Sequence, residues 1–124
     1  MQKNENEKKY KIGEFAQKLC VNMQTLRLYD KAGILCPKRS EGGQRWYDDD
    51  DFERAKTILY LTHGLLLNLN GVKIILNFLK KGRLSPALGL ELLKDMVKSA
   101  GISDEEILNN LKRYNDEVSN VLEI

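Results

Sequence analysis

The sequence predicts a mainly α-helical protein: two short helices joined by a tight turn, then a small β-hairpin, then further helices. Three observations support this fold class. Apolar residues recur at helical spacing between residues 12 and 31, with a three-residue break between two runs. A Gly-Gly pair separates two short basic segments within residues 37–47, which is typical of a hairpin. Helical apolar spacing then returns from residue 52 onward.

Length and composition indicate one ordinary globular domain with appended helices. The chain has 124 residues, of which 42% are hydrophobic and 31% charged. No apolar run approaches the roughly 20 residues that a membrane span needs. The first residues, MQKNENEKKY, lack the apolar segment of a secretory signal. We therefore expect a cytoplasmic, nucleoid-associated protein with no membrane contact, whose residues 1–9 form a flexible solvated arm.

Few residues are available for a metal or redox site. Cys20 and Cys36 are the two cysteines, and His63 is the one histidine. A structural zinc site needs four ligands, and a small secreted disulfide scaffold carries more cysteines than this. We interpret the cysteines as small apolar filler, with a reactive thiol as the alternative, and we expect no metal and no cofactor.

Charge is distributed unevenly along the chain. Residues 1–47 hold ten Lys and Arg against five Asp and Glu, whereas residues 48–124 hold ten against thirteen. The front part is therefore basic and the back part acidic, although the whole chain carries only +2. This asymmetry favours contact between the front part and a polyanion.

The basic part begins with two predicted helices. KIGEFAQKL has apolar residues at helical spacing, which predicts a short helix over residues 13–19. CVN follows as a turn, and Asn22 is a plausible N-cap for the next helix. That second helix, MQTLRLYDKAG, ends at Gly33. Two short helices joined by a three-residue turn are typical of a helix-turn-helix.

A short hairpin with basic residues is predicted after the second helix. Pro37 marks a strand entrance, Lys38 and Arg39 follow it, and residues 40–43 form a turn. A second strand over residues 44–47 returns from this turn. Such a wing would extend the face of the second helix into one continuous cationic surface.

Four consecutive aspartates end the basic segment. Asp48 is placed to cap the third helix, and residues 49–51 would lie in its first turn, where the helix dipole favours anions. A divalent-cation site is the alternative. Consecutive acids on a helix point in different directions, however, so we prefer the capping interpretation.

Residues 10–79 resemble the DNA-binding domain of the MerR family of transcriptional regulators. The matching motifs are, in order, IGEFA, TLRLYDKAGIL, CPKR, GGQRWYDDDDFERAKTI and LNLNGVKIIL. QTLRLYD, the double-Gly wing and NLNGVKIIL resemble the family's short, repressor-type members most. The chain departs from the family pattern at Arg45-Trp46, where two basic residues are frequent, and at Gln44, where an aromatic is common.

The resemblance implies which residues contact DNA. They are Gln24, Thr25, Arg27 and Tyr29 on the second helix, Lys38, Arg39, Gln44 and Arg45 in the wing, and Arg54 on the third helix. Arg and Gln can read purine edges, and Thr and Tyr hydroxyls suit phosphates. The alternatives are a packing role for Tyr29 and Tyr47 and an ion pair between Arg54 and Asp50, while Leu26 and Leu28 are expected inside.

Residues 84–124 are expected to form a helical region for dimerisation or for a protein partner, separate from a DNA-binding domain at residues 10–81. Pro86 begins one helix and Gly101 ends it. A single helix over about residues 104–123, with Ser103 as its N-cap, then carries a heptad seam of Ile107, Leu111, Tyr114, Val118 and Val121. Members of the family pair their C-terminal helices between two copies. Packing of the seam on residues 86–100 of the same chain is the alternative.

These observations predict a homodimeric regulator of transcription, more specifically a repressor, that binds double-stranded DNA at a promoter inverted repeat and distorts it. The alternatives are an excisionase-like or architectural DNA-bending factor, and a protein-interaction module that uses the winged helix. The sequence contains no nucleophile–base pair and no phosphate-binding Gly loop, so we expect no enzymatic activity.

Overall fold

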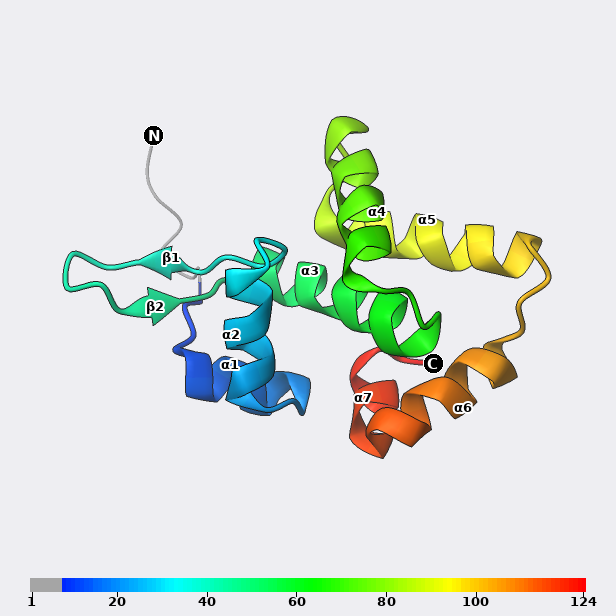
Figure 1. Ribbon diagram of the computed structural model, residues 1–124, viewed down its shortest axis with the longest axis horizontal. Helices are drawn as coiled ribbons and strands as arrows, with labels where there is room; N and C mark the ends of the chain where they lie inside the picture. Colours follow the sequence, from blue (N-terminus) through cyan, green and yellow to red (C-terminus); the bar gives the residue numbers. More distant parts are fainter. Residues whose placement is uncertain (1–7) are drawn as a thin grey trace.

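The computed structural model describes residues 8–124, so most of the expected N-terminal arm lies outside the described residues. Figure 1 shows α1, α2 and a small hairpin at one end of the molecule, and α4 to α7 at the other. In chain order the elements are α1 (Ile12–Leu19), α2 (Met23–Lys31), β1 (Lys38–Arg39), β2 (Arg45–Trp46), α3 (Asp49–Leu59), η1 (Tyr60–Gly64), α4 (Leu69–Lys81), α5 (Pro86–Ser99), α6 (Asp104–Tyr114) and α7 (Asp116–Val121).

The two N-terminal helices form the predicted helix-turn-helix. α1 ends at Cys20, which takes the left-handed conformation at φ 62°. The Asn22 side chain caps α2 by accepting a hydrogen bond from the backbone N–H of Gln24 at 2.8 Å. Gly33 follows α2 at φ 75°, a conformation that favours glycine, so the chain turns sharply toward the wing.

The wing is an antiparallel pair of strands, β1 and β2, reached after residues 34–37. Lys38 lies opposite Trp46, and Arg39 lies opposite Arg45. Gly43, at φ 82°, provides the positive φ that the turn requires. Tyr10 pairs with Tyr47 through two backbone hydrogen bonds of 2.7 and 2.8 Å, which ties the chain before α1 to the base of the wing.

The aspartate run begins α3, as the capping interpretation predicted. Asp48 Oδ1 accepts from the backbone N–H of Asp51 at 2.8 Å, and Asp51 Oδ2 accepts from the backbone N–H of Asp48 at 3.0 Å. This reciprocal capping box fixes the start of the helix. At its far end α3 continues into a single π-helical turn, η1, closed by a 2.9 Å bond from Leu65 N–H to the Tyr60 carbonyl.

One hydrophobic core joins the two ends of the chain. Phe15 stacks on Tyr47, with ring centroids 4.2 Å apart, beneath the wing. The same core continues through residues from α2, α3, η1 and the C-terminal helices, among them Leu26, Ile58, Leu59, Leu61, Ile107, Leu111, Val118 and Leu122. The regions expected at residues 10–81 and 84–124 therefore share a core.

The prediction of a single helix over residues 104–123 is wrong, because the helix is interrupted at Asn115. Asn115 has extended backbone at φ −167°, and it separates α6 from α7. Its side chain makes two bonds that explain the break. Nδ2 donates to the Cys20 carbonyl at 2.8 Å, and Oδ1 accepts from the backbone N–H of Glu117 at 3.0 Å, capping α7.

The expected seam is largely buried within its own chain. Ile107, Leu111 and Val118 are each at most 1% exposed, while Val121 is half-buried and Tyr114 is at the surface. α6 packs on η1 rather than on residues 86–100. Asn110 Nδ2 donates to the Gly64 carbonyl at 2.8 Å, and the ring of Tyr114 stacks on His63 with centroids 3.5 Å apart. Residues 104–123 therefore do not present a continuous exposed heptad seam.

None of the helices described within residues 8–124 has the length and apolar character needed to cross a membrane.

Candidate nucleic-acid interface

The exposed side of α2 carries most of the predicted reading residues. Gln24 and Arg27 are exposed, and Thr25 is half-buried. All three lie in the first half of α2 (Met23–Lys31), next to the turn after α1. This is the part of a recognition helix that contacts base edges in the major groove.

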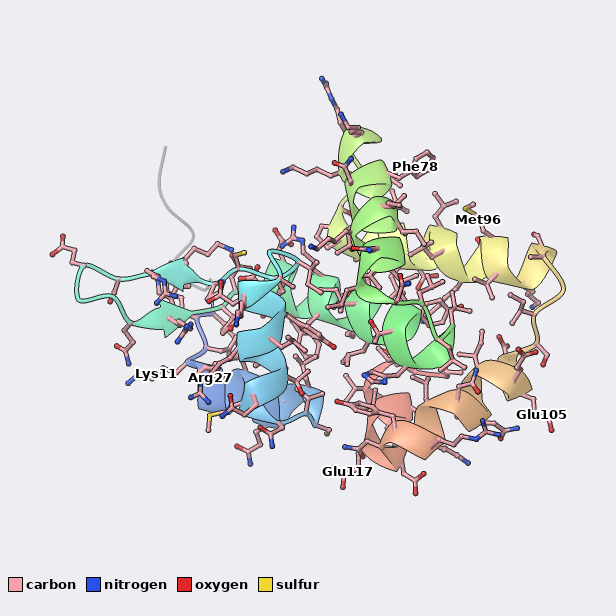
Figure 2. All side chains as sticks on the ribbon, in the orientation of Figure 1. Lys11, Arg27, Phe78, Met96, Glu105 and Glu117 are labelled. Atoms are coloured by element: carbon pink, nitrogen blue, oxygen red, sulfur yellow. The ribbon has the colours of Figure 1, made fainter. Side chains whose placement is uncertain are left out.

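Two further residues join this face that sequence reasoning did not assign. Lys11, just before α1, is exposed, and Figure 2 shows it on the same side of the molecule as Arg27. Leu28, expected inside, is 51% exposed and offers an apolar contact of the kind that thymine methyl groups accept. The basic character of Lys11 was visible in the sequence, but its place beside α2 depends on how α1 packs.

Tyr29 is buried, unlike Gln24 and Arg27 on the same helix, which favours the alternative of a packing role over a contact with DNA. Its side chain is 3% exposed. Its hydroxyl has no hydrogen-bond partner within the described part of the chain. Burial raises the pKa of this hydroxyl well above its ordinary value, so the side chain remains neutral.

Asp30 holds the two wing arginines in place. Its Oδ2 atom accepts from Arg45 Nε at 3.1 Å and from Arg39 Nη2 at 3.3 Å. Arg39 Nη1 also donates to the Gly43 carbonyl at 3.1 Å. The Asp30 carboxylate on α2 offsets part of the charge of the two guanidinium groups. Because each ion pair joins α2 to the wing, it also fixes the direction of the arginine side chain.

Lys38 is exposed, but its ammonium group is paired with carboxylates at the start of α3. Its Nζ lies 2.8 Å from Asp48 Oδ2 and 3.0 Å from Asp51 Oδ2. Burial lowers the pKa of Lys38, but the hydrogen bonds that Nζ donates to the two carboxylates outweigh it, so its pKa is raised. The ammonium joins the wing to the start of α3, and a phosphate would have to compete with both carboxylates.

The two remaining predicted DNA contacts, Gln44 and Arg54, differ in whether their side chains are already paired within the chain. Gln44 is exposed near the tip of the wing. Arg54 Nη1 pairs with Asp51 Oδ1 at 3.2 Å, not with Asp50 as the alternative proposed. Trp46 is half-buried, and Lys9 Nζ lies 4.5 Å from its ring centroid, which places another cation at the base of the wing.

Taken together, this end of the molecule presents a polar helix beside a cationic hairpin. The helix carries Gln24, Thr25 and Arg27, which are the predicted base contacts, and the nearby cations are Arg39, Arg45 and Lys11. A helix of this kind has the size to enter a major groove, and a basic hairpin beside it can follow the phosphate backbone.

Comparison with known proteins agrees with this geometry. The family model described as MerR HTH family regulatory protein matches residues 10–79, which is more than half of the chain. The chain belongs to the MerR family. Residues 10–79 therefore form a helix-turn-helix domain of the MerR type.

Relatives within the MerR family differ in how much of the chain they match. The "Putative heat shock protein HspR" of Streptomyces coelicolor is 36% identical over 67 residues, covering 54% of this chain and 44% of that protein. The "Mercuric resistance operon regulatory protein" of Bacillus cereus is 40% identical over 51 residues, covering 40% and 39%. The uncharacterised regulator YyaN of Bacillus subtilis is 34% identical over 97 residues, covering 76% and 62%. The chain thus spans less than half of the first two. No solved structure matches it significantly.

Potential metal ligands do not converge in this MerR-family chain. Within residues 8–124, no three His, Cys, Asp or Glu side chains come together in a group that could hold a metal ion. Cys20 is half-buried and Cys36 is exposed, and both are free.

Proposed function

We propose that the protein is a homodimeric transcriptional repressor that binds an inverted repeat in a promoter and distorts the DNA between the half-sites. The observation that carries this proposal is the division of the surface. α2 and the wing lie at one end of the molecule, and α4 and α5 lie at the other (Figure 1). The first pair carries polar and cationic side chains, and the second carries large exposed apolar side chains, here called the apolar face.

The DNA end supports sequence-specific binding rather than charge attraction alone. Arg27 is exposed with no carboxylate partner among the described residues, and Gln24 beside it is also exposed. The wing arginines are already oriented by Asp30, so less side-chain freedom is lost when they meet phosphate. Fixed donors beside a reading helix favour one register on the duplex.

A second copy is the occupant that best fits the apolar face. Five large apolar side chains on α4 and α5 are 39% to 70% exposed, namely Ile74, Phe78, Leu88, Leu92 and Met96. Figure 2 shows Phe78 and Met96 projecting from the two helices on the same side of the molecule. Together the five expose on the order of 500 Å² of apolar side chain, a large part of the about 800 Å² per partner in a standard interface.

The spacing on α5 suits a two-fold contact. Leu88, Leu92 and Met96 follow one another every fourth residue, so they form one stripe along the helix. In an antiparallel pairing, Leu92 would meet its own copy and Leu88 would meet Met96 of the other chain, which makes the surface self-complementary. This interface would replace the buried seam of α6 and α7.

The proposals of transcriptional repression and of DNA distortion rest on the resemblance to other family members, not on a contact within this chain. The wing and the NLNGVKIIL segment resemble short, repressor-type members of the family. A two-fold dimer holding two reading helices apart would impose its own half-site spacing on the DNA. Deforming the duplex to that spacing lets such a regulator act through DNA shape as well as through occlusion.

Selection of bound sequences from a random duplex pool, at two salt concentrations, tests the DNA part. We expect enrichment of an inverted repeat. Arg27→Ala should cost about 1–3 kcal/mol and relax preference at one base position. Arg113→Ala, an exposed arginine on α6, is the matched control and should change nothing. Salt-sensitive binding without an enriched motif would favour an architectural DNA-bending factor, and absence of binding would favour a protein-interaction module.

Sedimentation equilibrium tests the dimer independently. Phe78→Asp with Leu92→Asp places charges in the apolar face, so we expect a monomer with unchanged helical content. Lys80→Asp with Lys98→Asp changes exposed positions away from the apolar stripe on the same two helices and serves as the control. A dimer that persists in the first variant rules out this face as the interface.

A further inference from the structure

A cavity of about 450 Å³ lies between the DNA-binding end and the C-terminal helices. Its walls come from the residues after α2, from α3, from one side of α4, and from the start of α5. The volume falls in the range of about 300–1,000 Å³ that is typical of small-molecule sites. The cavity therefore connects parts of the chain that are distant in sequence.

The polar lining is positively charged. Arg54, Lys73 and Lys80 contribute cationic groups, with the amide of Asn77 between the lysines. Among the described residues that line the cavity, none is acidic. Arg54 pairs with Asp51, which approaches it from outside the lining, but within residues 8–124 neither lysine takes part in an ion pair. Two cations without a counter-ion thus face one cavity.

The floor of the cavity is apolar. Ile34 and Leu79 are nearly buried, at 6% and 9% exposure, and Leu76 and Leu84 are half-buried beside them. An aliphatic floor beneath cationic groups suits a ligand with an apolar body and an anionic group. A DNA phosphate would use only the cations, because the duplex backbone cannot enter a concave site and cover such a floor.

We propose that this cavity binds a small organic anion, in which a carboxylate, sulfonate or phosphate group meets Lys73 and Lys80 while an apolar body of one or two rings covers Ile34, Leu76 and Leu79. This assignment goes beyond the proposed function and does not depend on it.

α4 connects the cavity to the apolar face, because its two sides line one and carry part of the other. Lys73, Leu76, Asn77 and Lys80 line the cavity, whereas Ile74 and Phe78 of the same helix are exposed on the apolar face described above. A ligand in the cavity would contact the chain after α2 on one side and α4 and α5 on the other. Ligand binding would therefore favour one position of α4 relative to α2 and the wing.

A pair of fluorescent probes tests the charge requirement. 8-Anilinonaphthalene-1-sulfonate has an apolar body and one sulfonate, and N-phenyl-1-naphthylamine has a closely similar body without the anion. We expect saturable binding of the sulfonate probe with one site per chain. Lys73→Gln with Lys80→Gln should weaken it about tenfold or more, the change expected from losing one charge-assisted hydrogen bond. Binding of the neutral probe should not change.

Matched variants distinguish binding in the cavity from binding elsewhere on the protein. Lys81→Gln with Lys98→Gln removes the same charge from exposed positions outside the cavity and should leave binding unchanged, because solvent and salt screen those positions. Equal weakening in both lysine variants would overturn the proposal, since general charge attraction would then account for the binding. Loss of binding in Phe78→Ser with Met96→Ser, with the cavity lysines irrelevant, would place the probe on the apolar face and also overturn it.

Glycine amide resonances locate the site directly in the full chain. Gly33 and Gly89 line the cavity, whereas Gly43 and Gly101 lie in the wing and after α5. The sulfonate probe should shift the first two signals and leave the last two in place. Absence of saturable binding, or shifts confined to the distant glycines, would refute the assignment.

Discussion

Replacing Lys38 with alanine separates two roles that a basic wing residue can have. The sequence suggested a phosphate contact, so its loss would weaken binding to all DNA sequences and lower the salt slope by about one unit. The structure instead places its Nζ between Asp48 and Asp51, at 2.8 and 3.0 Å. We therefore expect Lys38→Ala to reduce the stability of the protein and to leave the salt slope nearly unchanged.

The expected size of this loss follows from the surroundings of the ion pair. Asp51 is 1% exposed, and removing the partner of a buried charge costs about 3–5 kcal/mol. Lys38 is 43% exposed, however, and exposed pairs contribute only about 0–1 kcal/mol. Arg54 and the backbone N–H of Asp48 continue to bind the Asp51 carboxylate in the variant. We expect a loss of about 1–2 kcal/mol, between these two limits.

Urea unfolding followed by circular dichroism measures the change, with Lys112→Ala on the exposed surface of α6 as the control. A double-mutant cycle with Asp51→Asn isolates the pair, since the two losses should not add. If the free energy of unfolding of Lys38→Ala equals that of the wild type while the salt slope falls by about one unit, the anchoring role is refuted and Lys38 contacts phosphate.

Three further predictions concern residues whose surroundings the structure revealed. Tyr29→Phe should be neutral or stabilising in urea unfolding and should leave DNA affinity unchanged, because it removes a buried hydroxyl that has no hydrogen-bond partner within residues 8–124. A loss of affinity would instead support a contact between Tyr29 and DNA. Asn115→Ala should lower the free energy of unfolding by about 1–2 kcal/mol, because it removes the cap of α7 and the bond to the Cys20 carbonyl; an unchanged urea midpoint would contradict this. Burial lowers the pKa of His63 below its ordinary 6.5, so the unfolded chain binds the proton more readily and the free energy of unfolding should fall as the pH drops below 6.5. His63→Phe, which keeps an aromatic ring against Tyr114, should flatten this dependence, and an identical pH profile in the variant would contradict it.

Elements set by neighbouring residues could be predicted from the sequence. Asn22, Asp48 and Ser103 each cap a helix at the expected position, because a cap needs only a side-chain oxygen and a backbone N–H two or three residues away. The wing was located for the same reason, since Gly43 provides the positive φ at its turn. These interactions join residues two to three positions apart, so a short stretch of sequence is enough to predict them.

Features that depend on distant partners could not be predicted. Leu28 and Tyr29 are adjacent on α2, and only the packing of α2 on the core decides that the tyrosine is buried and the leucine exposed. The heptad spacing of residues 107–121 predicted one helix. The side chain of Asn115 instead bonds to the Cys20 carbonyl, 95 positions earlier in the chain, and the helix is interrupted there. The salt bridges of Lys38 and Asp30 likewise join separate elements, so charge alone suggested free phosphate contacts where the structure shows anchors.

The bond between Asn115 and Cys20 has a consequence for synthesis of the protein on the ribosome. The turn between α1 and α2 receives one of its hydrogen bonds from a residue made 95 positions later, and η1 receives another from Asn110. Local pieces such as the capped helices can form as the chain emerges, but these contacts close only when α6 and α7 have left the exit tunnel. Until then Gly64 and Cys20 lack these partners, and the nascent chain leaves part of the future core uncovered. A ribosome stalled before residue 110 should therefore carry a chain that proteases and chaperones still recognise as unfinished.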